Sequence, residues 1–190
     1  MDGEIVLRKQ ILPAKAFKNL SVDSKIVNDF ITMDIETIKM KIDSKKRSLV
    51  PYLICAYNGT DYITSYANES LNQKDLFTSF INQLLNFFKD SNILTVYAHN
   101  LSGFDGIFLM KHLLSYGKVT PLLFNGKLMS IKVKIGNKKS NYKTIIFKDS
   151  YLLLPLSLRK LCLAFNIETP KGYFPFLLTK VFYTGVIPKF

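Results

Sequence analysis

Three acidic residues stand at the ends of two apolar stretches, and their types and spacing could support metal-dependent chemistry. Asp34 and Glu36 close the stretch 30–36, and Asp105 follows the turn after the stretch 92–98. The first stretch is typical of a β-strand, in which residues at i and i+2 point to the same face, so we expect Asp34 and Glu36 side by side. Carboxylates are the ligands that Mg²⁺ prefers, and a pair of such ions can cleave a phosphodiester. The pattern therefore predicts a metal site if the three carboxylates converge.

Asp105 lies in a predicted strand–turn–helix unit. Residues 92–98 are an apolar run typical of a buried strand, residues 100–103 have turn chemistry, and residues 104–116 carry apolar side chains at helical spacing. The carboxyl end of such a strand is where α/β proteins usually build a site. Two plainer interpretations stay open here: the first two acids as a solvent-facing strand end, and Asp105 as a favourable charge in the first turn of a helix.

The ordered motifs resemble the 3′–5′ exonuclease region of family B DNA polymerases. Asp34-x-Glu36-Thr37 resembles the first exonuclease motif of that family, and residues 97–108 (Tyr-Ala-His-Asn-Leu-Ser-Gly-Phe-Asp-Gly-Ile-Phe) resemble the second. Residues 157–161, Ser-Leu-Arg-Lys-Leu, add a further similarity. The similarity is greatest to the protein-primed branch, which is found in linear plasmids of fungal and plant mitochondria and in some phages.

Lys171 belongs to the last matching segment. In the protein-primed branch a Lys-x-x-apolar motif follows the strand and helix after the second motif, and Lys171 and Phe174 fit it. The family's third exonuclease motif, Tyr-x-x-x-Asp, does not occur after Lys171, and the family's polymerase motifs are absent from the 190 residues. The resemblance therefore predicts the front part of a larger polymerase, as a fragment, an interrupted reading frame or one exon.

The resemblance also implies roles for individual side chains. Asp34, Glu36 and Asp105 would hold two divalent ions, Mg²⁺ or Mn²⁺, which activate the attacking water and stabilise the leaving 3′ oxygen. Lys171 would act in catalysis by placing positive charge near the scissile phosphate. The single-stranded 3′ end would be held by Thr37, His99, Asn100, Phe104, Ser150, Tyr151 and Lys171.

Each of these side chains also has a plainer possible role. His99 could be a histidine at the edge of the core, and Ser150 a turn or cap residue. Phe104 could be core at the start of a helix, and Lys171 an ordinary turn lysine. The Tyr151 assignment is the least direct, because the family commonly has Ser-Leu after its strand-end Asp and this chain has Ser-Tyr.

Three functions are compatible with these residues. The first is the proofreading exonuclease segment of a protein-primed, DNA-directed DNA polymerase, a nucleotidyltransferase of DNA replication. The second is a free-standing 3′–5′ exonuclease that acts on DNA or RNA. The third is a non-catalytic remnant that binds single strands. For the first, the resemblance implies primer–template DNA, a terminal protein primer and the remaining polymerase body as partners.

The composition favours a polyanionic partner. Lys and Arg number 26 against 14 Asp and Glu, which gives a net charge of +12 and a pI near 9.6. Lysine accounts for 23 of the 26, beside 13 asparagines. These residues have A/T-rich codons, so part of the excess has a genomic explanation that fits an organelle or plasmid gene. The resemblance and these residue types together imply a mitochondrial protein, and the lack of a transit-peptide pattern indicates one that is made in the organelle. No apolar run is long enough to cross a membrane, so we expect no membrane partner.

The predicted fold class is α/β, with a ribonuclease-H-like (DnaQ-like) exonuclease fold in which helices flank a mixed sheet. Residues 1–28 form a lead-in of uncertain structure with a possible strand at 4–7, and residues 29–190 form one exonuclease-like domain that is incomplete at its C-terminus. Strands are expected at 29–36, 49–57, 62–66, 93–98, 128–135 and 142–149, and helices at 73–89, 104–116 and 157–165. The order of the strands is not readable from the sequence.

Overall fold

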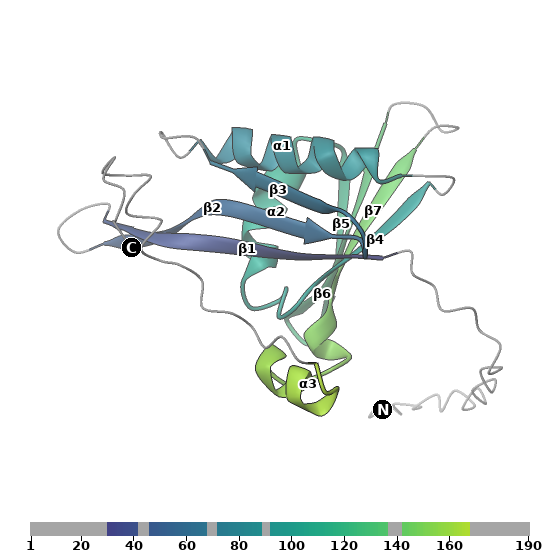
Figure 1. Cartoon of the computed structure of the whole chain (residues 1–190). Helices are drawn as coiled ribbons and strands as arrows, with labels where there is room; N and C mark the ends of the chain where they lie inside the picture. The colour runs from purple at the N-terminus through teal and green to yellow at the C-terminus, as the bar shows by residue number, and fades with distance from the viewer. Residues whose placement is uncertain (1–29, 42–45, 68–71, 89–91, 137–141, 168–190) are drawn as a thin grey trace, which may run out of the picture.

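A mixed sheet with helices packed on one face forms the centre of the molecule (Figure 1). The computed structural model describes residues 30–41, 46–67, 72–88, 92–136 and 142–167. The described strands are β1 (Phe30–Lys41), β2 (Arg47–Tyr57), β3 (Tyr62–Tyr66), β4 (Ile93–Ala98), β5 (Lys118–Phe124), β6 (Lys127–Ile135) and β7 (Lys143–Asp149). The helices are α1 (Gln73–Asn86), α2 (Asp105–Leu113) and α3 (Leu158–Ala164), with a 3₁₀ turn η1 (Ser150–Leu152). The strand order is β3-β2-β1-β4-β7-β6-β5.

The three central strands run parallel; β4 and β7 end at the same edge of the sheet, and β1 passes that edge and continues to Lys41. β4 pairs in parallel with β1 on one side and with β7 on the other, whereas the outer pairs are antiparallel. The register places Met33, Ala98 and Asp149 in one row across these strands. The residues that follow this row therefore meet at the carboxyl edge, which is where open α/β sheets build their sites.

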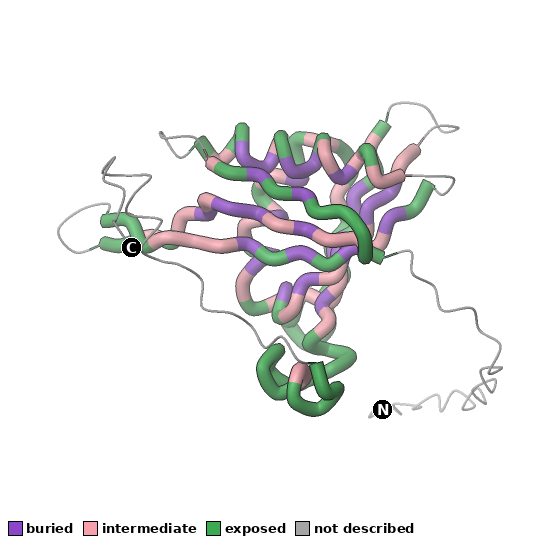
Figure 2. Tube along the Cα trace, in the orientation of Figure 1, coloured by how far each residue is buried: buried purple, intermediate pink, exposed green. Residues whose placement is uncertain are grey.

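The core lies between the sheet and the helices α1 and α2. Along β1, Ile31, Met33 and Ile35 are buried, while the residues between them face the other side of the sheet. Helix α1 contributes its buried stripe of Leu76, Phe77, Phe80, Ile81 and Leu84 to this core, and Figure 2 shows the buried stripes of helix and strands facing each other. Burial of one face of β1 leaves its even-numbered residues, including Asp34, on the opposite face.

A β-bulge follows the acidic pair of β1. Glu36 lies opposite Leu53 and Thr37 lies opposite Pro51, so that Tyr52 is an extra residue in β2. The bulge explains how a proline, which has no N–H group for the ladder, is accommodated inside β2. It also changes the pairing directly after Glu36.

The predicted mixed sheet is confirmed, but one strand was missing from the prediction. β5 (Lys118–Phe124) was not expected, although the turn Asn125-Gly126 has the positive φ angles, 48° and 75°, typical of a two-residue hairpin. Pro121 argues against a strand by sequence, but β5 is the edge of the sheet, where proline is tolerated.

Several predicted boundaries were also wrong by a few residues. β1 continues to Lys41, because β2 pairs with it as far as Arg47. Helix α1 ends at Asn86, and α2 ends at Leu113, where the Ser115 hydroxyl donates to the carbonyl of His112. Helix α3 is shorter than expected by one residue at each end, because Ser157 is its N-cap and Phe165 its C-cap.

The predicted lead-in 1–28, its possible strand at 4–7 and the segment 168–190 with Lys171 lie outside the described residues. Within the described ranges, no helix combines the length and the apolar character needed to cross a membrane.

Candidate active site

Asp105 connects helix α2 to strand β1 at the carboxyl edge of the sheet. It is the first residue of α2 and is only 2% exposed. The backbone N–H of Ile35 donates to its Oδ1 at 3.1 Å. Because Ile35 stands between Asp34 and Glu36 in β1, the predicted strand–turn–helix unit places Asp105 against the strand segment that carries the other two acids.

Burial makes the charged form of Asp105 unfavourable. Burial first and the nearby carboxylate of Asp34 second raise the pKa of this carboxyl from 3.8 to about 7, against the hydrogen bond from Ile35, which lowers it. Asp149 adds a smaller repulsion. A buried carboxyl beside a second carboxylate is stabilised by a proton or by a cation, and carboxylate oxygens suit Mg²⁺ or Mn²⁺.

Asp34 and Glu36 both lie near one thiol on the neighbouring strand. Cys55 pairs with Asp34 across β1 and β2. Burial raises the pKa of the Cys55 thiol most; a hydrogen bond with Thr64 lowers it, and the charges of Asp34 and Glu36 raise it. The described part of the chain contains no group of three His, Cys, Asp or Glu side chains arranged to hold a metal ion. The convergence of all three predicted ligands therefore stays a prediction.

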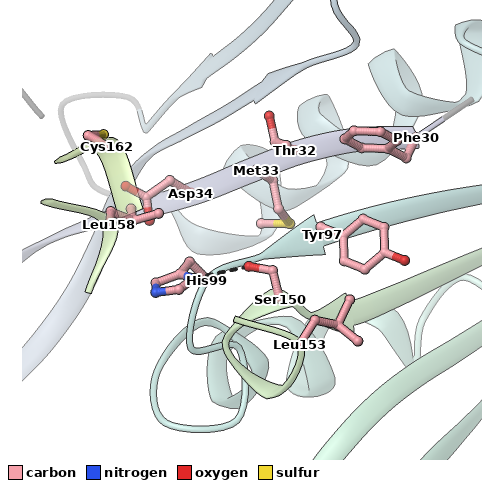
Figure 3. A pocket seen from close by; sticks show the side chains of 10 residues that line it. All are labelled: Phe30, Thr32, Met33, Asp34, Tyr97, His99, Ser150, Leu153, Leu158 and Cys162. Atoms are coloured by element: carbon pink, nitrogen blue, oxygen red, sulfur yellow. Dashed lines mark hydrogen bonds between the residues drawn. The ribbon is translucent and has the colours of Figure 1, made fainter. Parts of the chain in front are cut away.

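His99 joins the site to the segment after β7. Its Nε2–H donates to the carbonyl of Leu156 at 2.9 Å, and its Nδ1 then accepts from the hydroxyl of Ser150 at 3.1 Å (dashed in Figure 3). The ring of Tyr151 contacts the imidazole edge to face, with centroids 5.5 Å apart. Both ring nitrogens of His99 are thus used within the protein, which leaves the ring itself to face a ligand.

The turn between β4 and α2 depends on two glycines. Asn100 has a φ of 66°, and a Cβ at Gly103 would lie 2.7 Å from the Asn100 Oδ1. A Cβ at Gly106 would lie 2.7 Å from the carbonyl oxygen of Leu101. The glycines therefore let the turn close tightly over the start of α2, and Phe104 then packs edge to face on Phe108 at 5.3 Å.

Asp149 organises the same turn, and the sequence-based prediction missed it. Its Oδ1 accepts from the N–H groups of Asn100 at 3.0 Å and Tyr151 at 2.9 Å, and its Oδ2 accepts from Ser102 at 2.9 Å. The side chain is 3% exposed. An acidic residue at the end of a buried strand was the available signal, but its partners are visible only once β7 is placed beside β4.

A cavity of about 640 Å³ opens beside Asp34 on the face of the sheet away from α1. β1 contributes Phe30, Thr32, Met33 and Asp34 to its wall, and Figure 3 shows Tyr97 of β4 and His99 of the turn after it on the adjoining side. The remaining wall comes from η1 and α3 with the residues between them: Ser150, Leu153, Leu158 and Cys162. Its volume falls in the range typical of small-ligand sites.

The predicted strand-binding residues occupy different places around this cavity. His99 and Ser150 line it. Thr37, which follows the bulge in β1, and Asn100, Phe104 and Tyr151 are not part of its lining. Lys171 lies outside the described residues, so its predicted place near the scissile phosphate remains a prediction.

Solved structures of Phi29 DNA polymerase have a similar fold. The polymerase complexed with single-stranded DNA matches with a TM-score of 0.59 and 17% sequence identity over 77% of this chain and 25% of that chain. The complex with primer–template DNA matches with a TM-score of 0.57 and the same identity and coverage. At this identity the likeness concerns the fold alone, and it confirms the ribonuclease-H-like fold class.

Two fungal proteins and one family model match the sequence itself. The chain is 33% identical over 183 residues to a probable DNA polymerase of Ascobolus immersus and 34% identical over 190 residues to one of Neurospora intermedia. Each match covers 92% of this chain, which spans 14% and 19% of those two proteins. The family model of DNA polymerase type B, organellar and viral, matches residues 85–189, which is more than half of the chain. The chain belongs to the type B DNA polymerase family of organelles and viruses.

Proposed function

We propose that this chain is the 3′–5′ exonuclease segment of a protein-primed type B DNA polymerase, and that it removes nucleotides from single-stranded 3′ ends during DNA replication. The observation that carries the proposal is the placement of Asp105. It is a buried carboxyl that accepts from the N–H of Ile35, the residue between Asp34 and Glu36 in β1, at the carboxyl edge of parallel strands. Perturbed carboxyls in such a position are candidates for catalysis.

The acids Asp34, Glu36 and Asp105 would hold divalent ions, Mg²⁺ or Mn²⁺. Their fit rests on Asp105, because burial first and the charge of Asp34 second raise its pKa, and a cation would relieve both effects. When bound, such ions supply an activated water and stabilise negative charge on the phosphate and the leaving oxygen. Lys171 would add positive charge at the same phosphate.

The cavity beside Asp34 would receive the terminal nucleotide. Its aromatic and apolar walls from Phe30, Tyr97 and Leu153 exclude water and offer surfaces for a base. His99, fixed at both ring nitrogens, and Ser150 give the cavity a rigid polar side. Thr37, Asn100, Phe104 and Tyr151, which lie outside the lining of the cavity, would contact the 3′ end of the strand.

The longer protein would be a DNA-directed DNA polymerase, as the printed names of the fungal relatives suggest. Primer–template DNA would then be its substrate and a terminal protein its primer. The abundance of residues that have A/T-rich codons, such as lysine and asparagine, supports an organelle or plasmid gene and hence a mitochondrial location.

A second candidate function is single-strand binding without cleavage. The observation that favours it is the lack, within the described residues, of any group of three potential metal ligands. The net charge of +12 would support such binding without chemistry.

Digestion of a 3′-labelled single-stranded DNA with Mg²⁺ or Mn²⁺ separates the two functions. We expect the chain to release labelled mononucleotides. The variant Asp34→Asn/Asp105→Asn preserves the size of both side chains and should lose at least about 100-fold in rate, because the ion sites lose their charge. The matched control is Asp75→Asn, which neutralises an exposed acid in the first turn of α1 and should keep the parental rate.

Two other results would change the conclusion. A parent that binds the DNA in a salt-sensitive way but does not cut it supports the second candidate. Cutting that is unchanged in Asp34→Asn/Asp105→Asn places the catalytic groups elsewhere and contradicts the proposal.

A further inference from the structure

The segment between Asp105 and Asp149 contains no acidic residue. These 43 residues include nine lysines. In the described part of the segment the chain forms α2, β5, β6 and β7, which make up one half of the sheet and a helix that covers it. A gene rich in A/T accounts for many lysines, but it does not account for their arrangement on the folded chain.

Four of these lysines lie on the sheet face away from α1 and α2. Along β6, Ile131 and Val133 are fully buried toward the helices, so Lys132 and Lys134 face the other way and are exposed. Register places Lys118 of β5 opposite Lys134, and Lys148 of β7 opposite Ser130, on the same side. We call the four residues Lys118, Lys132, Lys134 and Lys148 the lysine face.

The lysine face has no carboxylate of its own strands to balance it. Asp149 is the single acidic residue in the four strands β4, β5, β6 and β7. It is buried, and its side chain accepts hydrogen bonds from three backbone N–H groups. Lys118 and Lys134 stand directly opposite each other in an antiparallel pair, an arrangement that destabilises a free sheet. A polyanion lying across this face would remove that repulsion.

The lysine face begins where the cavity ends. The Nζ of Lys148 lies 5.9 Å from the centroid of the Tyr97 ring, which lines the cavity and contacts Phe30 edge to face at 5.7 Å. β6 lies two strands from β4, roughly 10 Å away at the usual strand spacing. Aromatic rings followed by lysines are the surface that proteins use to bind single strands.

We propose that the lysine face binds the phosphates of single-stranded nucleic acid on the 5′ side of the terminal nucleotide, and that the strand leaves the cavity over Tyr97 and Lys148. The position of the 3′ end in the cavity rests on the proposed function. Binding of phosphates by the lysine face does not require cleavage and is tested without it.

The test compares two pairs of neutralised lysines with the same loss of charge. Lys132→Thr/Lys134→Thr replaces two lysines of the lysine face with threonine, which is a good strand-forming residue. Lys74→Gln/Lys111→Gln changes exposed lysines on α1 and α2, on the other side of the sheet. Binding of 5′-fluorescent oligothymidylates of 4 and 20 nucleotides to the full chain is followed by anisotropy in EDTA over a series of NaCl concentrations.

Each phosphate contact on a single strand contributes about 0.7 to the slope of log Kd against log salt. We therefore expect Lys132→Thr/Lys134→Thr to lower the slope for the 20-mer by about 1.4 and to leave the 4-mer unchanged. The helix variant should keep both parental slopes. Lys132→Arg/Lys134→Arg, which keeps the charge, should restore the slope for the 20-mer.

Three results would overturn the inference: equal slope losses in the lysine-face and helix variants, an unchanged slope in the lysine-face variant, or no binding of the 20-mer by the parent. Melting temperatures show whether Lys132→Thr/Lys134→Thr is folded, and removal of the repulsion between Lys118 and Lys134 should leave its melting temperature equal to or above the parental value. A parent that cuts neither oligonucleotide with Mg²⁺ or Mn²⁺ contradicts the proposed function, while the slopes in EDTA still decide the inference.

Discussion

At the residue scale, the Asp105 carboxyl determines how the site responds to pH. In the folded chain the Asp105 carboxyl keeps its proton up to a pH of about 7, whereas in the unfolded chain it releases the proton near the ordinary aspartate pKa of 3.8. Between these values the unfolded chain is ionised at this position and the folded chain is not. The contribution of Asp105 to the free energy of unfolding of the metal-free chain should therefore be highest below pH 4, fall as the pH rises toward 7, and level off above it.

The variant Asp105→Asn tests this dependence. Asparagine keeps an oxygen that can accept from the Ile35 N–H, and it has no proton to lose. Denaturant unfolding in EDTA should show the parent losing up to about 4 kcal/mol between pH 4 and pH 8, since each unit of pKa shift corresponds to about 1.4 kcal/mol. The difference between parent and variant should shrink below pH 4.

Asp61→Asn is the matched control, because Asp61 is an exposed acid in the turn between β2 and β3. It should reproduce the parental pH curve. A parent whose stability rises between pH 5 and pH 8 relative to Asp105→Asn would show that the folded state favours the ionised carboxyl, contrary to its burial.

The types of the site residues were predictable, but their partners were not. Asp34, Glu36 and Asp105 could be selected because they follow predicted strands at the end where α/β sheets build sites, and because they fall in the motifs that resemble the polymerase family. The role of Asp149 depends on contacts to N–H groups 47 and 49 residues away, and a sequence pattern does not contain them. For the same reason the sequence could not show that both ring nitrogens of His99 bind within the protein.

At the scale of elements, Asp149 fastens the end of β7 to the turn between β4 and α2. The turn carries His99 and Asn100 and leads directly into Asp105, so the position of the candidate site depends on this link. Two oxygens accept three N–H groups, and replacement by asparagine would turn one oxygen into an NH₂ group that faces a donor.

We expect Asp149→Asn to lower the free energy of unfolding by about 2–4 kcal/mol, because at least one charge-assisted hydrogen bond is lost and a buried donor is left unpaired. The nuclease rate of the variant, measured at a temperature where it is still folded, should also fall, because the turn between β4 and α2 shifts. Asp75→Asn, at the exposed start of α1, should cost less than about 1 kcal/mol. Full nuclease activity in a destabilised Asp149→Asn variant would show that the link serves stability alone.

Most elements were predictable because their hydrophobic patterns are clear, and β5 shows where this fails. The run Pro121-Leu122-Leu123-Phe124 lacks alternation and begins with a proline, so it does not look like a strand. This run forms a strand because β6 provides an edge to which it can hydrogen-bond and because the turn Asn125-Gly126 reverses the chain. The strand order was not predictable, because parallel pairing of β1, β4 and β7 involves contacts across long stretches of chain.

At the scale of the whole molecule, charge is distributed unevenly over the sheet. The acids Asp34 and Glu36 lie on β1, whereas the lysine face occupies β5 to β7. The net charge of +12 adds a general repulsion that opposes the compact state. The same lysines should thus reduce the stability of the free chain and increase its affinity for a polyanion.

Salt should consequently have opposite effects on folding and on binding. Raising NaCl from about 50 to about 300 mM shortens the Debye length and screens the repulsion, so the melting temperature of the free chain should rise by roughly 2–4 °C, equivalent to about 1 kcal/mol. Over the same range the affinity for a 20-nucleotide single strand should fall, because the release of counterions into a more concentrated salt solution is less favourable. Thermal melts and anisotropy on the same samples measure both effects.

Lys132→Thr/Lys134→Thr should show a smaller salt response in both measurements, because the lysines that repel each other in the free chain are those that contact the strand. A melting temperature that falls with NaCl in the parent would mean that attraction between the acids and the lysines outweighs their repulsion, and the lysine face would then be balanced within the protein.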